Sequence, residues 1–230
     1  MRSITWLSPH DAPEYFPPAE QALEEPAGLL AAGGDLSPQR LLAAYRRGIF
    51  PWYSPGQPVL WWSPDPRAVL FPEEFRCTRS LAKTLRNAGF TASLDRDFTQ
   101  VIDGCAAPRA ASPGTWITSE MRAAYLRLHQ LGYAHSVEVW HRAALVGGLY
   151  GVRLGAVFFG ESMFSRVRDA SKVALAHLIG VCRRNAMVVI DCQLPSHHLA
   201  SLGARSIPRR QFQALLAEHV STAVIPLQEP

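Results

Sequence analysis

The stretch "ALVGGLYGVRLGAVFFGESMF", residues 144–164, decides the fold, because its apolar run is long enough for two strands. The tripeptide RLG at 153–155 interrupts the run, so the stretch predicts two strands joined by a tight turn. "SVEVW" (136–140) predicts a strand before this hairpin, and "MVVIDC" (187–192) predicts a buried strand after it. A helix is expected between the hairpin and the strand at 187–192, from about residue 169 to 184, with an acid at its start and two arginines at its end. The order strand, strand, strand, helix, strand, helix predicts an α+β (or α/β) sheet.

The composition is that of a globular protein. The chain has 230 residues, of which 48% are hydrophobic and 18% are charged, so it can bury a sizeable core in one large domain or two small ones. No apolar run approaches the roughly 20 residues of a membrane-spanning helix, and the first residues lack the apolar core of a signal peptide. The four cysteines form no C-x-x-C pair, which favours reduced thiols. We therefore expect a cytoplasmic protein without a membrane partner.

The first part of the chain is dense in proline, glycine and tryptophan. The serine–proline pair at 37–38 predicts the start of a helix. Prolines interrupt the segment GIFPWYSPGQPVLWWSPDP (48–66) throughout, so it predicts a rigid, aromatic-lined loop region rather than a helix or a central strand. A domain boundary is expected at its end, which gives a small N-terminal domain (residues 1–64) and a larger second domain (residues 65–230).

A basic stripe runs along the helix that is expected after Thr78. Arg79, Lys83 and Arg86 fall at i, i+4 and i+7, on the face opposite its leucines, with no acid among them. Such a stripe is either an ordinary solvated helix face or a surface that contacts nucleic-acid phosphates. A formal net charge of +4 is compatible with a polyanionic partner but does not by itself indicate one.

Eight stretches in a fixed order carry a resemblance to a known family. They are GLLAAGGDLSPQRLLAAYRRGIFPW (28–52), WWSPDPRAVL (61–70), GTWIT (114–118), GGLYGV (147–152), GESMFS (160–165), ASK (170–172), DCQ (191–193) and SLGA (201–204). Together they resemble the leucyl/phenylalanyl-tRNA–protein transferases over nearly the whole chain. The order of strands and helices also resembles the GNAT-type acyltransferase fold, which is expected here for the C-terminal domain.

The family resemblance implies a defined activity. The enzyme would move Leu or Phe (also Met) from charged tRNA to the α-amino group of proteins with an N-terminal Arg or Lys, and so mark them for degradation by the N-end rule. We expect a monomer that uses no metal and no organic cofactor. An aminoacyl ester is already activated, and a peptide α-amino group with a pKa of about 7.7–8.0 is partly neutral near pH 7. The enzyme therefore needs alignment more than a strong base, and alignment can lower the barrier by about 7–11 kcal/mol.

The candidate catalytic residues are Asp191, Gln193 and Glu161. Asp191 and Gln193 are separated by one residue at the end of a buried strand, so both are expected to face the same gap. The amide of Gln193 is expected to orient the attacking amine or the ester, and Asp191 to hold that amide and attract the substrate cation. The resemblance suggests a proton relay through this pair, whereas the alternative is an ordinary strand-end aspartate that caps a turn.

Glu161 follows an apolar strand, where an acid is costly to desolvate unless it meets a cation. The acceptor brings two cations, its α-ammonium group and its Arg or Lys side chain. Glu161 and Asp191 are expected to receive them, and the sequence does not decide which acid takes which charge. In the empty enzyme we expect a salt bridge from Glu161 to Arg166 or Arg168.

The substrate-binding candidates fall into two groups. A shape-selective apolar pocket for the donor side chain is expected from residues that would be equally typical of a core, namely Leu149, Phe158, Met163, Leu178 and Ile190. A stacking surface for the 3′ adenosine of tRNA is expected, by match to the family motifs, from Trp52, Trp116, Tyr45 and Tyr125. The basic stripe of Arg79, Lys83 and Arg86 is then expected to contact tRNA phosphates.

Three other functions compete with this interpretation. An acyl-CoA-dependent N-acyltransferase of GNAT type needs a glycine-rich pyrophosphate loop, but RVRDASK (166–172) contains no glycine. A non-catalytic RNA-binding protein would bind tRNA whether or not it is charged. A metal enzyme built on Cys192, His197 and His198 lacks a fourth ligand at suitable spacing.

Overall fold

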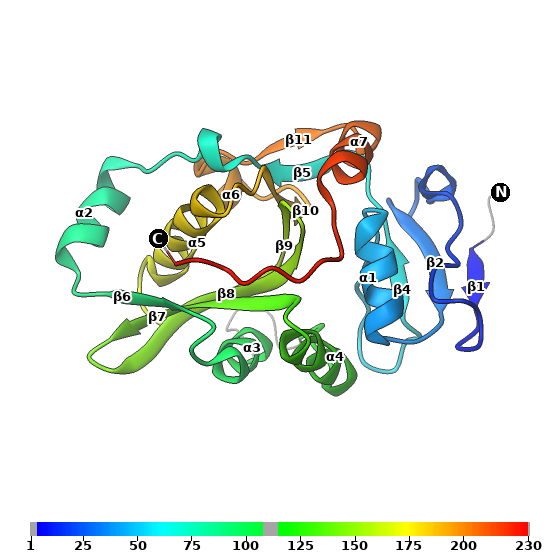
Figure 1. The fold of residues 1–230 in the computed structure, drawn as a ribbon, viewed down its shortest axis with the longest axis horizontal. Helices are drawn as coiled ribbons and strands as arrows, with labels where there is room; N and C mark the ends of the chain where they lie inside the picture. The colour runs from blue at the N-terminus through cyan, green and yellow to red at the C-terminus, as the bar shows by residue number, and fades with distance from the viewer. Residues whose placement is uncertain (1–3, 108–114, 230) are drawn as a thin grey trace.

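The computed structural model describes residues 4–107 and 115–229, which form two sheets with helices packed around them (Figure 1). The strands are β1 (Thr5–Leu7), β2 (Leu29–Gly33), β3 (Phe50–Pro51), β4 (Leu60–Trp62), β5 (Arg67–Leu70), β6 (Thr91–Leu94), β7 (Ala134–His141), β8 (Ala144–Leu154), β9 (Val157–Ser165), β10 (Val189–Gln193) and β11 (Arg205–Ile207). The helices are α1 (Pro38–Arg46), α2 (Arg79–Asn87), α3 (Phe98–Ala106), α4 (Ser119–Gln130), α5 (Ala170–Arg184), α6 (His197–Ser201) and α7 (Arg209–His219), with short 3₁₀ turns at Ala19–Gln21 and Pro72–Glu74.

The small sheet has the strand order β1-β2-β4-β3. The loop interpretation of residues 48–66 is therefore wrong for β4, which is a central strand between β2 and β3. Its three residues contain no proline, since Pro58 and Pro64 flank the strand, so every backbone group needed for pairing is present. The predicted helix start is confirmed, because the Ser37 side chain accepts a hydrogen bond from the backbone N–H of Arg40 at the first turn of α1.

The large sheet has the strand order β11-β5-β10-β9-β8-β7-β6. The predicted hairpin is confirmed as β8 and β9, and β7 pairs with the other edge of β8. Helix α5 crosses from β9 to β10, which run parallel, while the other neighbours in this sheet are antiparallel. The α+β class is therefore confirmed. The chain passes from the small sheet to the large one between the end of β4 and the start of β5.

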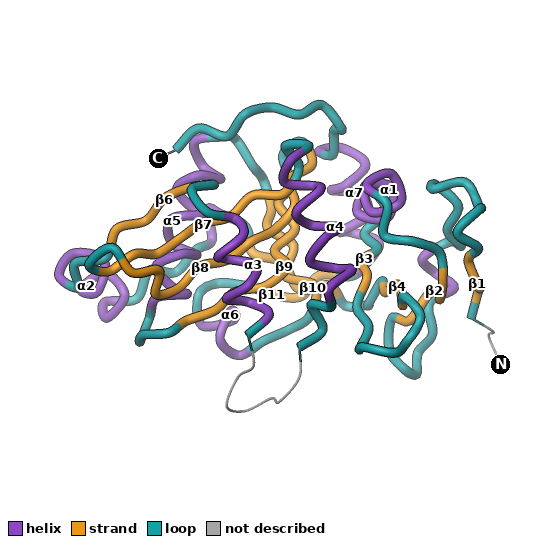
Figure 2. The backbone as a smooth tube through the Cα atoms, turned by 90° about the horizontal axis from the view of Figure 1, so that it is seen from below, coloured by secondary structure: helices purple, strands orange, loops and turns teal. Residues whose placement is uncertain are grey.

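Helices cover both faces of the large sheet (Figures 1 and 2). Helix α5 packs on one face, and α3 and α4 lie side by side on the other. The core on the α3–α4 side continues into the small sheet and α1 without interruption, through Leu41, Tyr45 and Trp61. Of the helices in the described part of the chain, none has the length and apolar character that a membrane crossing requires. The site described next lies where this shared core meets the splayed centre of the large sheet.

Candidate active site

Two β-bulges on neighbouring strands aim side chains at the same gap. The pairing of β9 with β8 passes over Glu161, and the pairing of β10 with β5 passes over Cys192. The residue after the second bulge, Gln193, has a left-handed backbone with φ 55°. The pairing of β9 with β10 ends at Phe159 and Asp191, and the gap opens beyond this pair. Bulges commonly re-aim side chains at functional sites, and here they bring Glu161 and Gln193 together.

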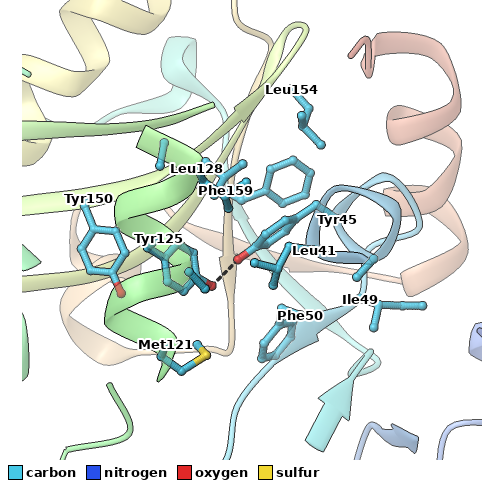
Figure 3. Packing of buried hydrophobic residues seen from close by; sticks show 14 of the residues in the cluster. Leu41, Tyr45, Ile49, Phe50, Met121, Tyr125, Leu128, Tyr150, Leu154 and Phe159 are labelled. Carbon is cyan, nitrogen blue, oxygen red and sulfur yellow. Dashed lines mark hydrogen bonds between the residues drawn. The ribbon is translucent and has the colours of Figure 1, made fainter. Parts of the chain in front are cut away.

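Glu161 lies in a clamp of two tyrosine hydroxyls. Tyr45 of α1 donates to its Oε1 at 2.7 Å, and Tyr125 of α4 donates to its Oε2 at 2.7 Å. The two hydroxyls also contact each other, as Figure 3 shows. Burial raises the pKa of Glu161 to about 7, although the two tyrosines act in the opposite direction. Burial also raises the pKa of both tyrosines well above the usual value, so they stay donors. Near neutral pH the carboxyl can therefore accept or release a proton.

The expected salt bridge from Glu161 to Arg166 or Arg168 is wrong. Arg168 pairs with Asp169 instead, and Arg166 donates to the backbone carbonyl of Leu145 at 3.0 Å. The physical reason is the bulge, which turns the carboxylate toward the tyrosines of α1 and α4, whereas the two arginines lie in the loop that leads into α5.

Asp191 is fully buried and has an internal partner. Arg67 of β5 donates to both of its carboxylate oxygens, at 2.7 and 2.6 Å, and the two side chains are at most 1% exposed. The expectation that Asp191 attracts the substrate cation is therefore wrong, because Arg67 already neutralises it. Its Oδ1 also accepts the backbone N–H of Gln193 at 3.0 Å. Asp191 thus stabilises the strained turn that places Gln193, and left-handed backbone of this kind costs about 1–3 kcal/mol.

Sequence reasoning missed Arg67. Its guanidinium lies 4.8 Å from the centroid of the Phe50 ring and 4.9 Å from that of Phe212, and it donates to the carbonyl of Gly48 at 3.1 Å. It therefore connects β10 to the small sheet and to α7. The signal that could have found it is an arginine at the start of the otherwise apolar strand "RAVL" (67–70), since a buried arginine requires an acidic partner.

Gln193 and Glu161 face each other across the gap. The Gln193 Nε2 atom lies 3.5 Å from Glu161 Oε1, which is a long contact. Both residues are of intermediate exposure, and both line two cavities that meet at this point. The structure thus brings the three candidate catalytic residues together, with Asp191 behind the other two.

An apolar cavity of about 260 Å³ opens on the α5 side of Glu161 and Gln193. It lies between β8, β9, β10 and α5. Its lining includes all five expected pocket residues together with Leu175, namely Leu149, Phe158, Met163, Leu178 and Ile190. Since an apolar cavity of about 150 Å³ holds a benzene ring, this one has room for a branched or aromatic side chain.

A second cavity, of about 150 Å³, lies on the small-sheet side of the gap. Trp52, from the loop after β3, and Trp116, from the segment before α4, both line it together with Glu161. The stacking role expected for Tyr45 and Tyr125 is wrong, because both rings are 0% exposed and neither offers a face to a base. Their hydroxyls bind Glu161 instead. Gly114, the first residue of the motif "GTWIT" (114–118), lies outside the described residues.

The basic stripe lies apart from these cavities. Arg79, Lys83 and Arg86 are all exposed on α2, which occupies the end of the molecule opposite the small sheet (Figure 1). Within residues 4–107 and 115–229, none of the three forms an ion pair. A ligand that contacts both the stripe and the cavities must therefore be large.

Two of the competing functions find little support in the geometry. In the described parts of the chain no three His, Cys, Asp or Glu residues are grouped as a metal site would need. At the start of α5 the Ser165 hydroxyl accepts the backbone N–H of Ser171 at 3.2 Å. A pyrophosphate of acyl-CoA bound at this helix start would need the backbone N–H of Ser171 as a hydrogen-bond donor. The loop also contains no glycine, which would allow a phosphate to approach the backbone closely.

Sequence comparison places the chain among the transferases and specifies the acyl donor. The family model described as leucyl/phenylalanyl-tRNA protein transferase matches residues 69–217, and the model of the corresponding N-terminal domain matches residues 34–65. A leucyl/phenylalanyl-tRNA–protein transferase from Azoarcus sp. (strain BH72) is 63% identical over 92% of this chain and 88% of its own length. One from Stutzerimonas stutzeri (strain A1501) is 58% identical over 94% of this chain and 95% of its own length.

The chain therefore belongs to the leucyl/phenylalanyl-tRNA–protein transferase family, whose members transfer aminoacyl groups from tRNA to proteins. Among solved structures, a GCN5-related N-acetyltransferase from Kribbella flavida matches with a TM-score of 0.39 and 11% identity, over 74% of this chain and 60% of that one. The structure of L-PGS from Bacillus licheniformis matches with a TM-score of 0.38 and 10% identity, over 82% of this chain and 60% of that one. These scores are too low to bear on function.

Proposed function

We propose that this transferase takes Leu, Phe or Met from charged tRNA and joins it to the α-amino group of proteins whose N-terminal residue is Arg or Lys. It would act as a monomer in the cytoplasm, where charged tRNA is made. The observation that carries the proposal is the meeting of an apolar cavity with Glu161 and Gln193 in one gap. The donor side chain and the attacking amine need such neighbouring apolar and polar surfaces.

The two cavities suit the two ends of the donor. The apolar cavity would hold the amino-acid side chain, and the cavity lined by Trp52 and Trp116 would hold the terminal adenosine, on which an aromatic face contributes about 1–3 kcal/mol by stacking. Glu161, Cys192 and Gln193 line both cavities, so the ester bond would lie beside them. Arg79, Lys83 and Arg86 on α2 would contact phosphates further along the tRNA.

The chemistry requires two protons to leave the acceptor nitrogen. Glu161 accepts the first from the α-ammonium group, whose pKa of about 7.7–8.0 is close to the pKa of about 7 of this carboxyl. The neutral amine then attacks the ester carbonyl, a C–N bond forms and the C–O bond to the ribose breaks. The second proton moves to the ribose oxygen that leaves. Gln193 orients the amine or the carbonyl through its amide, and Asp191 acts as a positioning residue behind it.

The proposal is tested by transfer of radiolabelled Leu from Leu-tRNA to a protein with an N-terminal Arg. Label is expected in acid-stable protein, and acetylation of the acceptor N-terminus should abolish its incorporation. Gln193→Ala is expected to slow transfer while tRNA binding is largely retained. A protein that binds charged and uncharged tRNA equally and transfers no label would refute the proposal and favour a non-catalytic RNA-binding function.

A further inference from the structure

A surface groove of about 320 Å³ lies beside the two cavities of the reaction site. It shares Leu194 with the cavity lined by Trp52 and Trp116, which we call the tryptophan cavity, and it shares Ser196 and Leu199 with the apolar cavity. We call it the α6 groove, and its lining consists of Ala68, Leu194, Pro195, Ser196, His197, Leu199, Ala200, Ala204, Arg205 and Ser206. A ligand that leaves the reaction site along this surface would enter the groove directly.

The α6 groove combines apolar walls with a positive charge. Its lining contains no carboxylate, and Arg205 and His197 are its ionisable side chains. Arg205 pairs with Glu74 at 2.8 Å, yet 46% of its side chain remains exposed, and its guanidinium lies 4.6 Å from the centroid of the Phe71 ring. Apolar walls suit a sugar or a base, and an anchored arginine suits a phosphodiester. A cationic protein N-terminus would find no counter-charge in this lining.

The position of the α6 groove indicates which substrate runs through it. Along the longest axis of the molecule, which is horizontal in Figures 1 and 2, α6 lies between β10, which carries Gln193, and α2, and Figure 2 shows it below the line that joins them. The groove therefore lies on the side of the reaction site that faces the basic stripe of Arg79, Lys83 and Arg86. A tRNA 3′ end that begins in the tryptophan cavity and continues toward α2 would cross the α6 groove.

We propose that the α6 groove binds the penultimate nucleotide of the tRNA 3′ end, with Arg205 against the phosphodiester that joins this nucleotide to the terminal adenosine. The proposal rests on the proposed function, because it assumes an aminoacyl-tRNA donor. It adds a nucleotide subsite outside the gap where the ester reacts.

The test compares two minimal donors, leucyl-adenosine and the leucyl ester of the dinucleotide CpA, with one acceptor peptide that begins with Arg. Ala200→Glu places a negative charge in the groove, and Ala200→Gln is the matched control because it adds a side chain of the same size without the charge. Ala200 is an exposed residue of the short helix α6, so both variants should fold. The KM for leucyl-CpA is expected to be about fivefold higher in Ala200→Glu than in Ala200→Gln at low salt, whereas the KM for leucyl-adenosine is expected to be the same in both.

A second variant tests the arginine with full-length substrate. Arg205→Gln should weaken binding of Leu-tRNA and reduce the slope of log KM against log salt by about one. Equal effects of Ala200→Glu on both donors, or no effect on either, would overturn the proposal. A changed KM for the acceptor peptide alone would also overturn it and would assign the groove to the acceptor chain. Wild-type enzyme that fails to use any of these donors would instead refute the proposed function.

Discussion

Replacing Tyr125 by phenylalanine should shift the pH at which transfer activity rises to a higher value. The Tyr125 hydroxyl donates to Glu161 Oε2 at 2.7 Å, and this bond lowers the pKa of the carboxyl against the effect of burial. A hydrogen bond to a charged group contributes about 1.5–3 kcal/mol, and about 1.4 kcal/mol corresponds to one pH unit. Loss of the bond therefore favours the protonated carboxyl, and the free enzyme should reach its active, deprotonated form about one to two pH units higher.

The measurement is kcat/KM against pH with leucyl-adenosine and a peptide that begins with Arg. Its lower limb reports ionisation of free enzyme, while the acceptor amine titrates identically for every variant. For the wild type this limb should lie near the Glu161 pKa of about 7. In Tyr125→Phe it should lie about one to two units higher, which lowers activity below pH 7 by about tenfold or more.

Tyr150→Phe provides the matched control. The Tyr150 ring packs edge-on against Tyr125, with 5.4 Å between ring centroids, and its buried hydroxyl makes no hydrogen bond within the described part of the chain. Its removal should leave the limb in place. If Tyr125→Phe lost activity by the same factor at every pH, Glu161 would not be the group that accepts the proton.

Three further substitutions test other parts of the site. Arg67→Met leaves the buried carboxylate of Asp191 without its cationic partner and should lower the free energy of unfolding in urea by about 3–5 kcal/mol. Loss of the exposed Arg205–Glu74 pair should lower it by at most about 1 kcal/mol, and similar losses in the two variants would contradict a stabilising role for the buried ion pair. The pKa of Glu161 is about 7 in the folded protein and 4.5 ordinarily, so the wild type loses stability as the pH rises from about 5 to about 8. Glu161→Gln removes this loss, so the gain in stability from the substitution should be about 2–3 kcal/mol larger at about pH 8 than at about pH 5. A shift in the thermal-unfolding temperature that does not depend on pH would exclude this effect. Leu178→Phe fills part of the apolar cavity, which leaves less room for the larger donor side chain. When the two charged tRNAs compete, transfer of Phe relative to Leu should fall by about tenfold or more. An unchanged ratio would place the donor side chain outside this cavity.

Sequence patterns were sufficient for the elements that local periodicity determines. The hairpin of β8 and β9, the crossover helix α5 and the strand β10 follow from apolar runs and turn residues that are contiguous in the chain. The five expected pocket residues line one cavity because they come from these same elements. That this cavity binds the donor side chain stays a prediction.

The roles of the acids could not be derived in the same way, because they depend on register between distant strands. The two-residue alternation of a regular strand placed Asp191 and Gln193 on one face, but the bulge at Cys192 breaks this alternation. Asp191 therefore pairs with Arg67, which is 124 residues away in sequence. A bulge likewise turns Glu161 toward Tyr125. Helical periodicity identifies a tyrosine on a helix face, but only the packing of α4 against the large sheet shows that its hydroxyl meets an acid.

The most direct test is a crystal structure with a leucyl-adenosine analogue in which an amide replaces the ester. The leucyl side chain should lie in the apolar cavity beside Leu178 and Ile190, the adenine should lie in the cavity of Trp52 and Trp116, and the carbonyl between them should face Gln193. A leucyl group outside that cavity, or a carbonyl directed away from Glu161 and Gln193, would contradict the proposal that these two cavities meet at the reacting bond.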